Sequence, residues 1–526
     1  MADAVHKAPP RVWLVGAGPG DPGLITCRGR ELLADAEVVL YDALAHPALL
    51  RGCRSDAHLV DVGKRYGQQA PPQAEVTERL LEFARRGKSV VRLKGGDPFL
   101  FSRGAEEAEA LVRAGIPFEV VPGVSSPVGT ATYAGFPLTH RDLSSSVAFV
   151  TGSDRHGRAR TPDSWAKVAA GVDTVCVLMG MRHIAEITQA MSLGRSGGTP
   201  AAVIQWGARS SQRVVVATLG TIAAEAAAAG LTNPAVVVVG EVVRLRDLLR
   251  WYDTKPLFGR RLLVLRPEHQ AQSTAKAIRA RGAEPIVTPA IAIHPPPEPE
   301  RLKQAAGQLP KYDWVVFTSA NGVLQLFSEL SGQNLDARAF GHAKLAAIGP
   351  KTAAALSQRG LRADHVATAY VGEVLAEGLL AHSPKRVLLL RALEARDTLP
   401  DLLRGAGVNV DVVPAYQTTP VSEAEGARLV ASLQSQQVDA VLFTASSTVT
   451  SLLDVLGQVT TEVLAKVVVA SIGPVTSETA RRRGLRVDVT AEQYTVDGLL
   501  DALERYYTVT ASADREGPPG LPAENR

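Results

Sequence analysis

Cysteine is scarce in this chain: only Cys27, Cys53 and Cys176 occur among 526 residues, and none forms a CxxC pair. An odd, small number argues against a disulfide framework, and the absence of CxxC spacing argues against a zinc site, so we expect no metal. No apolar run approaches the roughly 18 residues of a membrane span, and Met1 to Pro10 contain no apolar segment of signal-peptide type. These absences predict a cytoplasmic protein without membrane contact.

Aromatic residues and net charge are also low. Phe, Trp and Tyr together make up 5% of the chain against 46% hydrophobic residues, so the cores must consist mainly of Val, Leu, Ala and Ile. The formal charge of +4 is too small and too dispersed to indicate a nucleic-acid partner. The length corresponds to roughly three or four domains of about 150 residues.

The most informative stretch is VVRLKGGDPFLFSRG, from Val90 to Gly104. A short apolar run followed by Gly95-Gly96 predicts the end of a buried strand, where bare backbone lets a ligand approach closely. Asp97 follows, and ligands of open α/β sheets sit beyond the carboxyl ends of strands. The competing interpretation is a glycine-rich turn with Asp97 as a helix cap.

A second glycine-rich loop follows the first predicted strand, in RVWLVGAGPGDP from Arg11 to Pro22. A dinucleotide-binding loop is the obvious alternative, with Gly16 and Gly18 near the phosphates and Asp42 on a ribose. That motif requires a third glycine where this chain has Asp21, and it has no need of Pro19. The loop therefore argues against a nicotinamide nucleotide.

Predicted strands and helices alternate through the rest of the first half, which favours an α/β fold. The predicted strands lie at 37–42, 59–64, 118–126 (the last ending in a turn), 147–151, 174–180, 201–207 and 235–240, and the helices at 25–34, 73–86 and 221–230.

Several motifs in this half resemble the uroporphyrinogen-III C-methyltransferases of the precorrin methylase family. They are GAGPGDPGLIT, VVLYDAL, VGKR, VVRLKGGDPFLFSRG, VVPGVSS, PLTHRD, MGM and QWGARSSQR, in the family's order, between Arg11 and about Tyr252. The resemblance implies two α/β lobes with S-adenosyl-L-methionine in the cleft between them, S-adenosyl-L-homocysteine as by-product, and a homodimer formed through this half.

The resemblance also implies roles for individual residues. Asp42 and Lys64 match the family's proposed acid/base pair, and loss of protons from methylated pyrrole carbons gives a carboxylate base a task. Lys64 could instead pair with a substrate carboxylate as a point charge. Ser125-Ser126 stands where Thr-Ala is commoner in the family. The cofactor-contacting positions correspond to Pro19, Gly95, Gly96, Asp97, Leu100, Ser125, Ser126, Met179 and Gly207.

The second half contains an internal echo. YDWVVFTSANGV from Tyr312 resembles VDAVLFTASSTV from Val438, and LAAIGPKT from Leu345 resembles VASIGPVT from Val469. The duplication predicts two similar α/β lobes whose strand ends carry hydroxyl groups and helix amino ends, a setting suited to anions. The alternative is that these residues are ordinary helix caps. The candidate substrate-binding residues are Thr318, Ser319, Thr444, Ser446 and Thr476.

This half resembles uroporphyrinogen-III synthase through FTSANGV, AAIGPKT, LLLRALEARDTLPDLL, AYQTTP, FTASS and ASIGPVT, from about Phe258 to Tyr507. In that family the first lobe is split by the second in sequence. Tyr416 matches the tyrosine proposed to help expel hydroxide from the linear tetrapyrrole, since a phenol can donate that proton. It could also be a packed tyrosine at a hinge.

Together the resemblances imply a bifunctional enzyme that cyclises hydroxymethylbilane to uroporphyrinogen III and then methylates it twice to precorrin-2. Both fates of precorrin-2, sirohaem and cobalamin, stay open. The alternatives are a second half that only binds tetrapyrrole, or a methylase of another precorrin. The predicted domains are 1–253 for the methyltransferase, 254–510 for the synthase (lobe one 258–293 plus 418–507, lobe two 294–417), and a disordered tail at 511–526.

Overall fold

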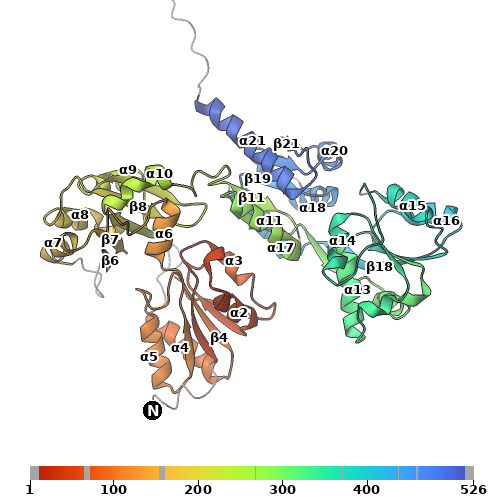
Figure 1. Cartoon of the computed structure of the whole chain (residues 1–526), viewed down its shortest axis with the longest axis horizontal. Coiled ribbons are helices and arrows are strands. Elements are labelled where there is room, and N and C mark those ends of the chain that lie inside the picture. Colours follow the sequence, from red (N-terminus) through yellow and green to blue (C-terminus); the bar gives the residue numbers. More distant parts are fainter. Residues whose placement is uncertain are drawn as a thin grey trace, which may run out of the picture. The chain divides into compact units, whose positions relative to one another are not determined.

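A computed structural model of the chain describes residues 11–63, 72–152, 160–266, 268–369, 371–435, 437–457 and 460–515 (Figure 1). The chain separates into two compact units. The first contains Met1–Arg260 with Ile278–Glu284 and Tyr507–Arg526, and the second contains Arg261–Ala277 with Pro285–Tyr506. Four sheets flanked by helices confirm the predicted α/β class.

The first sheet of unit 1 is wholly parallel in the order β3-β2-β4-β1-β5. Helices cover both faces, which explains why β1 and β2 are nearly continuous apolar runs rather than alternating. One face packs on α2 and α3, and the other packs on α4 and α5. The strands are β1 (Val12–Gly16), β2 (Val38–Tyr41), β3 (His58–Asp61), β4 (Val90–Lys94) and β5 (Phe118–Val121); the helices are η1 (Pro22–Leu24), α2 (Cys27–Asp35), α3 (Pro47–Leu50), α4 (Gln73–Arg85) and α5 (Gly104–Arg113).

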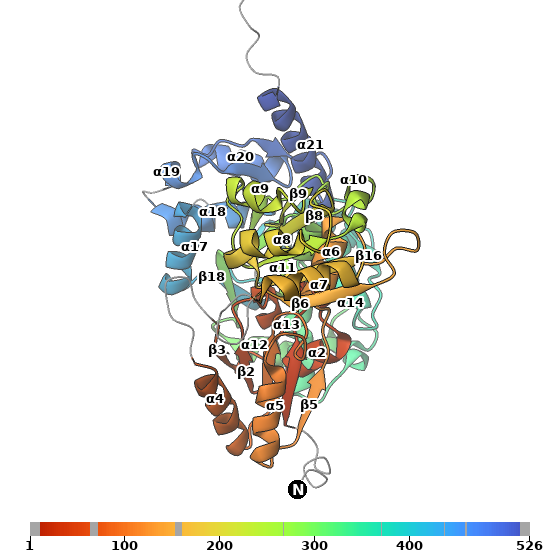
Figure 2. The same cartoon turned by 90° about the vertical axis from the view of Figure 1, so that its left-hand side faces the viewer.

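The second sheet of unit 1 is mixed, in the order β6-β7-β10-β8-β9, with only β6 and β7 parallel. Helices α7 and α8 lie side by side on one face (Figure 2), and α6, which follows the first sheet in sequence, packs on the other. Strand β9 was not predicted. The elements are α6 (Ser126–Ala134), β6 (Val147–Thr151), α7 (Pro162–Gly171), β7 (Thr174–Leu178), η2 (Met181–His183), α8 (Ile184–Met191), β8 (Pro200–Gln205), β9 (Arg213–Thr218), α9 (Ile222–Ala228), β10 (Ala235–Val239), η3 (Glu241–Leu245) and α10 (Arg246–Leu249).

Unit 2 contains the other two sheets, whose orders are β12-β11-β19-β20-β21 and β13-β18-β17-β14-β15-β16. The first elements of this half are β11 (Arg261–Val264), α11 (Glu268–Ala280), β12 (Glu284–Val287), β13 (Ile291–His294), α12 (Pro299–Ala306), η4 (Leu309–Lys311), β14 (Trp314–Phe317), α13 (Ala320–Gly332), η5 (Ala337–Phe340), β15 (Lys344–Ala347) and α14 (Pro350–Ser357). The remainder are β16 (His365–Val366), α15 (Gly372–Leu380), β17 (Arg386–Ala392), α16 (Thr398–Gly405), β18 (Asn409–Pro420), α17 (Glu423–Gln434), β19 (Ala440–Phe443), α18 (Ser446–Leu456), α19 (Thr460–Leu464), β20 (Val468–Ser471), α20 (Pro474–Arg482), β21 (Val489–Thr490) and α21 (Val496–Arg515).

The sequence echo corresponds to repeated structure. Strands β14 and β19 each lead through Thr and small residues into a helix, α13 or α18. Strands β15 and β20 each lead through Gly-Pro into α14 or α20, with proline at the start of the helix. Proline suits that position because it lacks the N–H that a first helical turn leaves unpaired.

The carboxyl-terminal helix corrects one expectation. Helix α21 continues to Arg515, five residues into the segment 511–526 that was predicted to be disordered. The run from Val496 holds no proline, and its one glycine, Gly498, lies in the first turn, whereas Gly-Pro-Pro-Gly begins at Gly517. Residues 516–526 lie outside the described residues.

The chain around the predicted boundary at 253/254 is packed rather than extended. Trp251, Tyr252 and Phe258 form an aromatic cluster with Tyr133, and the Tyr252 and Phe258 ring centroids are 5.4 Å apart. The boundary at 253/254 stays a prediction.

We expect fragments 1–253 and 257–510 each to unfold cooperatively in urea, because each contains its own sheets and apolar clusters. A fragment 1–260, which keeps the ring of Phe258, should have a higher urea midpoint than 1–253. Circular dichroism measures both. If neither half folds alone, the boundary or the independence of the halves is wrong.

Candidate active sites

Three strand ends meet closely in the first sheet because they consist of glycine. A Cβ on Gly16 would lie 2.6 Å from the Gly123 Cα, and a Cβ on Gly123 would lie 2.3 Å from the Gly96 carbonyl oxygen. The N–H of Gly96 donates to the Gly18 carbonyl at 2.8 Å, and the Gly18 N–H donates back at 3.2 Å. Any side chain here would force the ends of β1, β4 and β5 apart.

Asp97 connects two of these ends. One carboxylate oxygen accepts the Phe99 N–H at 2.8 Å and the other accepts the Gly123 N–H at 3.0 Å. It is not the helix cap considered above, because α5 is preceded by Arg103 in that position. A carboxylate has about four lone-pair sites, so Asp97 can still accept hydrogen bonds from a ligand.

A cavity of about 280 Å³ lies between the two lobes of unit 1. Six of the nine predicted cofactor positions line it: Pro19, Gly95, Gly96, Ser126, Met179 and Gly207. Other lining residues, which the sequence did not single out, are Gly18, Leu44, Thr130, Leu178, Ile204, Trp206, Asn233, Pro234, Ala235 and Val236. The walls are largely apolar side chains and bare backbone, as in many small-molecule sites.

The other three predicted cofactor positions, Asp97, Ser125 and Leu100, do not line the cavity. Asp97 follows Gly96, Ser125 is the N-cap of α6, and Leu100 lies in the turn between β4 and α5.

Three residues of the second lobe that are not glycine have left-handed backbone conformations near this cavity. Met179, Trp206 and Ala208, after β7 and β8, have positive φ values of 54°, 49° and 61°. Such conformations are costly for residues other than glycine, and they cluster at binding and active sites. Here they follow directly on the strands, where Met179 and Trp206 form cavity wall.

Arg209 joins the two walls of the cavity. Its Nη2 donates to the Leu44 carbonyl at 2.6 Å, and its guanidinium lies 4.8 Å from the centre of the Trp206 ring. Burial lowers the pKa of Arg209. The lobes also approach closely at Gly20, whose Cβ would lie 2.6 Å from the Gly207 carbonyl oxygen.

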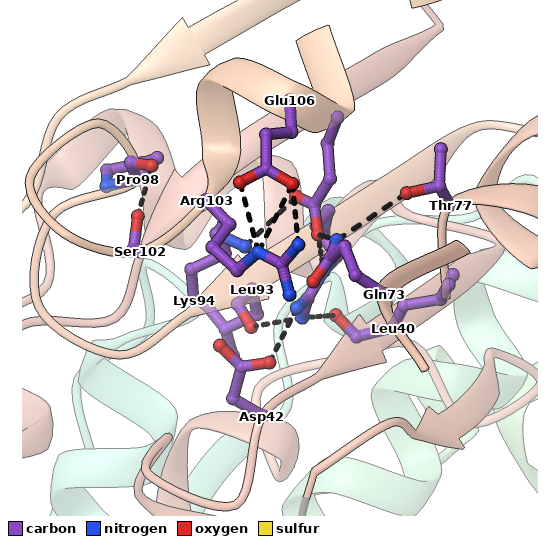
Figure 3. A network of polar contacts seen from close by, with 12 residues as sticks. Leu40, Asp42, Gln73, Thr77, Leu93, Lys94, Pro98, Ser102, Arg103 and Glu106 are labelled. Atoms are coloured by element: carbon purple, nitrogen blue, oxygen red, sulfur yellow. Dashed lines mark hydrogen bonds and ion pairs between the residues drawn. The ribbon is translucent and has the colours of Figure 1, made fainter. Parts of the chain in front are cut away.

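Asp42 lies at the end of β2 and belongs to a network of buried charges (Figure 3). Its N–H donates to the Leu93 carbonyl at 3.2 Å, and its carboxylate pairs with Arg92 at 2.6 Å. Arg92 also pairs with Glu107 at 3.1 Å, and Glu107 pairs with Lys94 at 3.0 Å. Asp42 is the accessible end, with 27% of its side chain exposed, against 4% for Arg92 and 0% for Glu107.

The pKa shifts in this network follow from burial and charge. Burial and the neighbouring Arg92 lower the pKa of Lys94, against the opposing pull of Glu107. For Arg92, burial favours the neutral form, but the carboxylates of Asp42 and Glu107 outweigh it and raise its pKa.

Arg103 and Glu106 form a second, exposed pair above this network, with 2.7 Å between Nη2 and Oε2 (Figure 3). Arg103 has a left-handed φ of 62°. The hydrogen bond and charge of Arg103 lower the pKa of Glu106. Lys64, the predicted partner of Asp42, lies outside the described residues.

The second candidate site lies in the sheet that contains β14, β17 and β18. Tyr416 is buried on β18, and its hydroxyl donates to the Ser319 hydroxyl at 3.0 Å. Ser319 also caps α13 by accepting the Gly322 N–H at 3.1 Å. The Thr318 N–H and hydroxyl both donate to the Leu390 carbonyl.

Thr318 also lines a cavity of about 280 Å³ with Gly372, Arg391, Arg396 and Thr398. The Arg391 side chain is 11% exposed and pairs with Asp397 at 2.7 Å, while its Nε is buried without a hydrogen-bond partner. These arginines lie within LLLRALEARDTLPDLL, but the sequence alone did not mark them as binding residues.

The remaining predicted residues lie in the sheet that contains β11, β19 and β20. The Thr444 hydroxyl accepts Arg266 Nε at 2.9 Å, and burial lowers the pKa of that arginine. The Ser446 hydroxyl accepts the Thr479 hydroxyl at 3.0 Å. Thr476 is buried in the first turn of α20.

Within the described ranges, no three His, Cys, Asp or Glu side chains gather as metal ligands would. Among the helices of the described ranges, none is both long and apolar enough to span a bilayer.

Comparison with known proteins places both halves in families. Residues 11–223 match the tetrapyrrole (corrin/porphyrin) methylases, and residues 272–501 match uroporphyrinogen-III synthase HemD. The porphyrin biosynthesis protein HemD of Ruminiclostridium josui is 38% identical over 496 residues, which cover 94% of this chain and 97% of that protein.

Two further relatives match part of the chain. The uroporphyrinogen-III C-methyltransferase of Bacillus subtilis is 38% identical over 350 residues, covering 66% of this chain and 71% of that protein. The uroporphyrin-III C-methyl transferase of Thermus thermophilus, solved with S-adenosyl homocysteine, is 39% identical; the match covers 45% of this chain and 99% of that one, with a TM-score of 0.38.

The fold and the matches define an enzyme of tetrapyrrole biosynthesis built from two different α/β enzymes. The chain belongs to the family in which a uroporphyrinogen-III C-methyltransferase is fused to a uroporphyrinogen-III synthase, and it is bifunctional.

Proposed function

We propose that the second half closes hydroxymethylbilane to uroporphyrinogen III with inversion of the last ring, and that the first half methylates that product twice to precorrin-2. The observation that carries the proposal is the fusion itself: residues 272–501 match the enzyme family that makes the substrate of the family matched by residues 11–223.

The cavity between the lobes of the first half binds S-adenosylmethionine in this proposal. Its residues fit such a ligand: Ile204 and Val236 offer an apolar surface to a flat base, and Gly95 and Gly96 leave backbone open to a polar chain. The ligand's sulfonium supplies the methyl group. Asp97 keeps the glycine backbone in place through Phe99 and Gly123 and can accept hydrogen bonds from the ligand.

Asp42 is the general base in this proposal. It lies two residues before Leu44, which lines the cavity, but is not itself part of the lining. A carboxylate at that place can accept the proton that a pyrrole carbon loses after methylation. Lys64 either works with Asp42 or pairs with a substrate carboxylate.

In the second half we assign substrate binding to Thr318, Ser319, Thr444, Ser446 and Thr476, together with the arginines 391 and 396. The buried, unpartnered Nε of Arg391 beside Thr318 supports binding of acetate and propionate groups. Tyr416 donates the proton that leaves with hydroxide, and its present partner is Ser319. Orientation of the chain ends supplies most of the rate.

Two structural expectations complete the proposal. The halves divide at 253/254, with synthase lobes at 258–293 plus 418–507 and at 294–417. The first half pairs with a second copy, for which the exposed rings of Phe99 and Phe101 are candidate contacts.

Gly96→Val should weaken S-adenosylmethionine binding at least tenfold, about 1.4 kcal/mol. The new side chain would enter the cavity 3.1 Å from the Ser126 hydroxyl. Gly115→Val is the matched control, because Gly115 has the same left-handed backbone, φ +68° against +69°, with nothing near its Cβ. Titration calorimetry decides: equal affinity in both variants, or binding of NAD(P), would show that the cavity has another use.

Asp42→Asn should lower methyl transfer to uroporphyrinogen III by about 100-fold or more, the usual scale for loss of a general base. The affinity for S-adenosylmethionine should stay within twofold. Asp163→Asn, which breaks only a surface pair with Lys167, is the control. Normal turnover with weakened cofactor binding would reverse the assignment of Asp42.

Tyr416→Phe should lower the turnover of ring closure by more than it raises KM, because the phenol acts on the leaving hydroxide. Ser319→Ala removes the same hydrogen bond but keeps the phenol. We expect that variant to raise KM modestly, since a neutral hydrogen bond contributes about 0.5–1.5 kcal/mol, and to lower turnover less. Equal loss of turnover in both variants would mean that Tyr416 only packs.

A further inference from the structure

Strand β4 carries two cations into the interior of the first lobe. Its side chains alternate, so Arg92 and Lys94 face α4 and α5 while Val91 and Leu93 face α2. Arg92 and Lys94 are 4% and 1% exposed, and their shared partner Glu107 on α5 is fully buried. Gln73 at the start of α4 donates to the same carboxylate at 2.9 Å.

A gain in the free energy of unfolding does not explain this buried cluster of charges. Taking charges out of water costs several kcal/mol for each ion, and apolar residues of similar volume often stabilise a fold as well or better. The surroundings here are apolar and could accept such residues, since Val90, Leu80 and Leu111 pack on the same face. The charges therefore have another use.

The geometry of Arg92 points to that use. Its Nε binds Glu107, its Nη1 donates to the Leu40 and Leu93 carbonyls at 3.4 and 3.2 Å, and its Nη2 binds Asp42 at 2.6 Å. A planar guanidinium held at three corners cannot turn, so the direction of the Nη2 hydrogen bond is fixed. Figure 3 shows Asp42 below this network and Lys94 within it.

Among the four charged side chains described in the network, Asp42 has by far the largest exposed fraction. The pair fixes one carboxylate oxygen and leaves the other for solvent or substrate. Two basic side chains, Arg92 and Lys94, thus pair with the two carboxylates of Asp42 and Glu107.

We propose that Arg92 is a positioning residue for methyl transfer: it holds the Asp42 carboxylate in one orientation, while Glu107 and Lys94 hold Arg92. This inference rests on the proposed role of Asp42 as general base. Arg92 itself contacts no substrate in this scheme and acts through Asp42 alone.

The test is a double-mutant cycle on the full chain, with Arg92→Met, Asp42→Asn and both together. Arg92→Met should lower kcat for methyl transfer at least tenfold while KM for uroporphyrinogen III and the affinity for S-adenosylmethionine stay within twofold. In the Asp42→Asn background the same change should lower kcat by no more than about twofold, because residues that act as a unit are not additive.

Two variants separate positioning from folding. Arg246→Met removes another buried arginine–aspartate pair of the same unit, to Asp253, so it should lower the melting temperature without lowering kcat. Arg92→Lys keeps the charge but not the fork, and should recover part of the lost kcat; it carries the cycle if Arg92→Met does not fold.

The outcomes distinguish the role of Arg92 from the proposed role of Asp42 as general base. Normal turnover in Asp42→Asn would refute the proposed base. Impaired turnover in Asp42→Asn, combined with kcat in Arg92→Met no lower than in Arg246→Met, would refute the role of Arg92 alone. Full additivity in the double variant would also refute it, because Arg92 would then act independently of Asp42.

Discussion

The first half depends on the close approach of three strand ends. Gly16, Gly96 and Gly123 bring the ends of β1, β4 and β5 so near one another that a single Cβ would lie between 2.3 and 3.1 Å from its neighbours. The Asp97 carboxylate then connects the ends of β4 and β5. Because these strand ends expose backbone without side chains, the second lobe of the first half can approach them. A mainly apolar cavity remains between the two lobes.

Strand β4, which ends at this glycine backbone, also carries two buried basic side chains. Arg92 and Lys94 precede Gly95 and Gly96 directly, so one short strand both opens the cavity and supports the carboxylate of Asp42. Strand β2 pairs with β4 and ends beside it, and Asp42 directly follows its last residue, Tyr41. In the proposed mechanism, cofactor binding and proton transfer therefore depend on the same strand, and the register between β2 and β4 sets where Asp42 lies relative to Gly95.

Much of this could be predicted from the sequence, and the failures have physical causes. Most first-half strands and the helices at 25–34, 73–86 and 221–230 follow from local apolar patterns. Strand β9, whose outer face is partly exposed, and the helices α3, α6, α7 and α8 were not individually predicted. The Asp97 bond to Gly123 spans 26 residues, and no local pattern shows it. Arg92 and Lys94 stand within a strand of otherwise apolar residues. Their partners, Asp42 and Glu107, are distant in sequence, so no local pattern predicts the network.

In the second half, the hydroxyl residues at strand ends could be identified because the echo repeats them. Arg391 and Arg396 could not be identified as candidate binding residues from the sequence. They line a cavity that forms only when α15 and α16 pack beside β17. The tail was placed five residues too early because helix propensity continues past the last apolar position that marks α21.

The central claim is that one chain performs both reactions in sequence. The most direct measurement supplies hydroxymethylbilane to the intact protein, with and without S-adenosylmethionine, and identifies the tetrapyrroles by isomer separation and mass. We predict uroporphyrinogen III without the methyl donor and its doubly methylated product with it. Only the spontaneous type I isomer, or type III that stays unmethylated when the donor is present, would contradict this function.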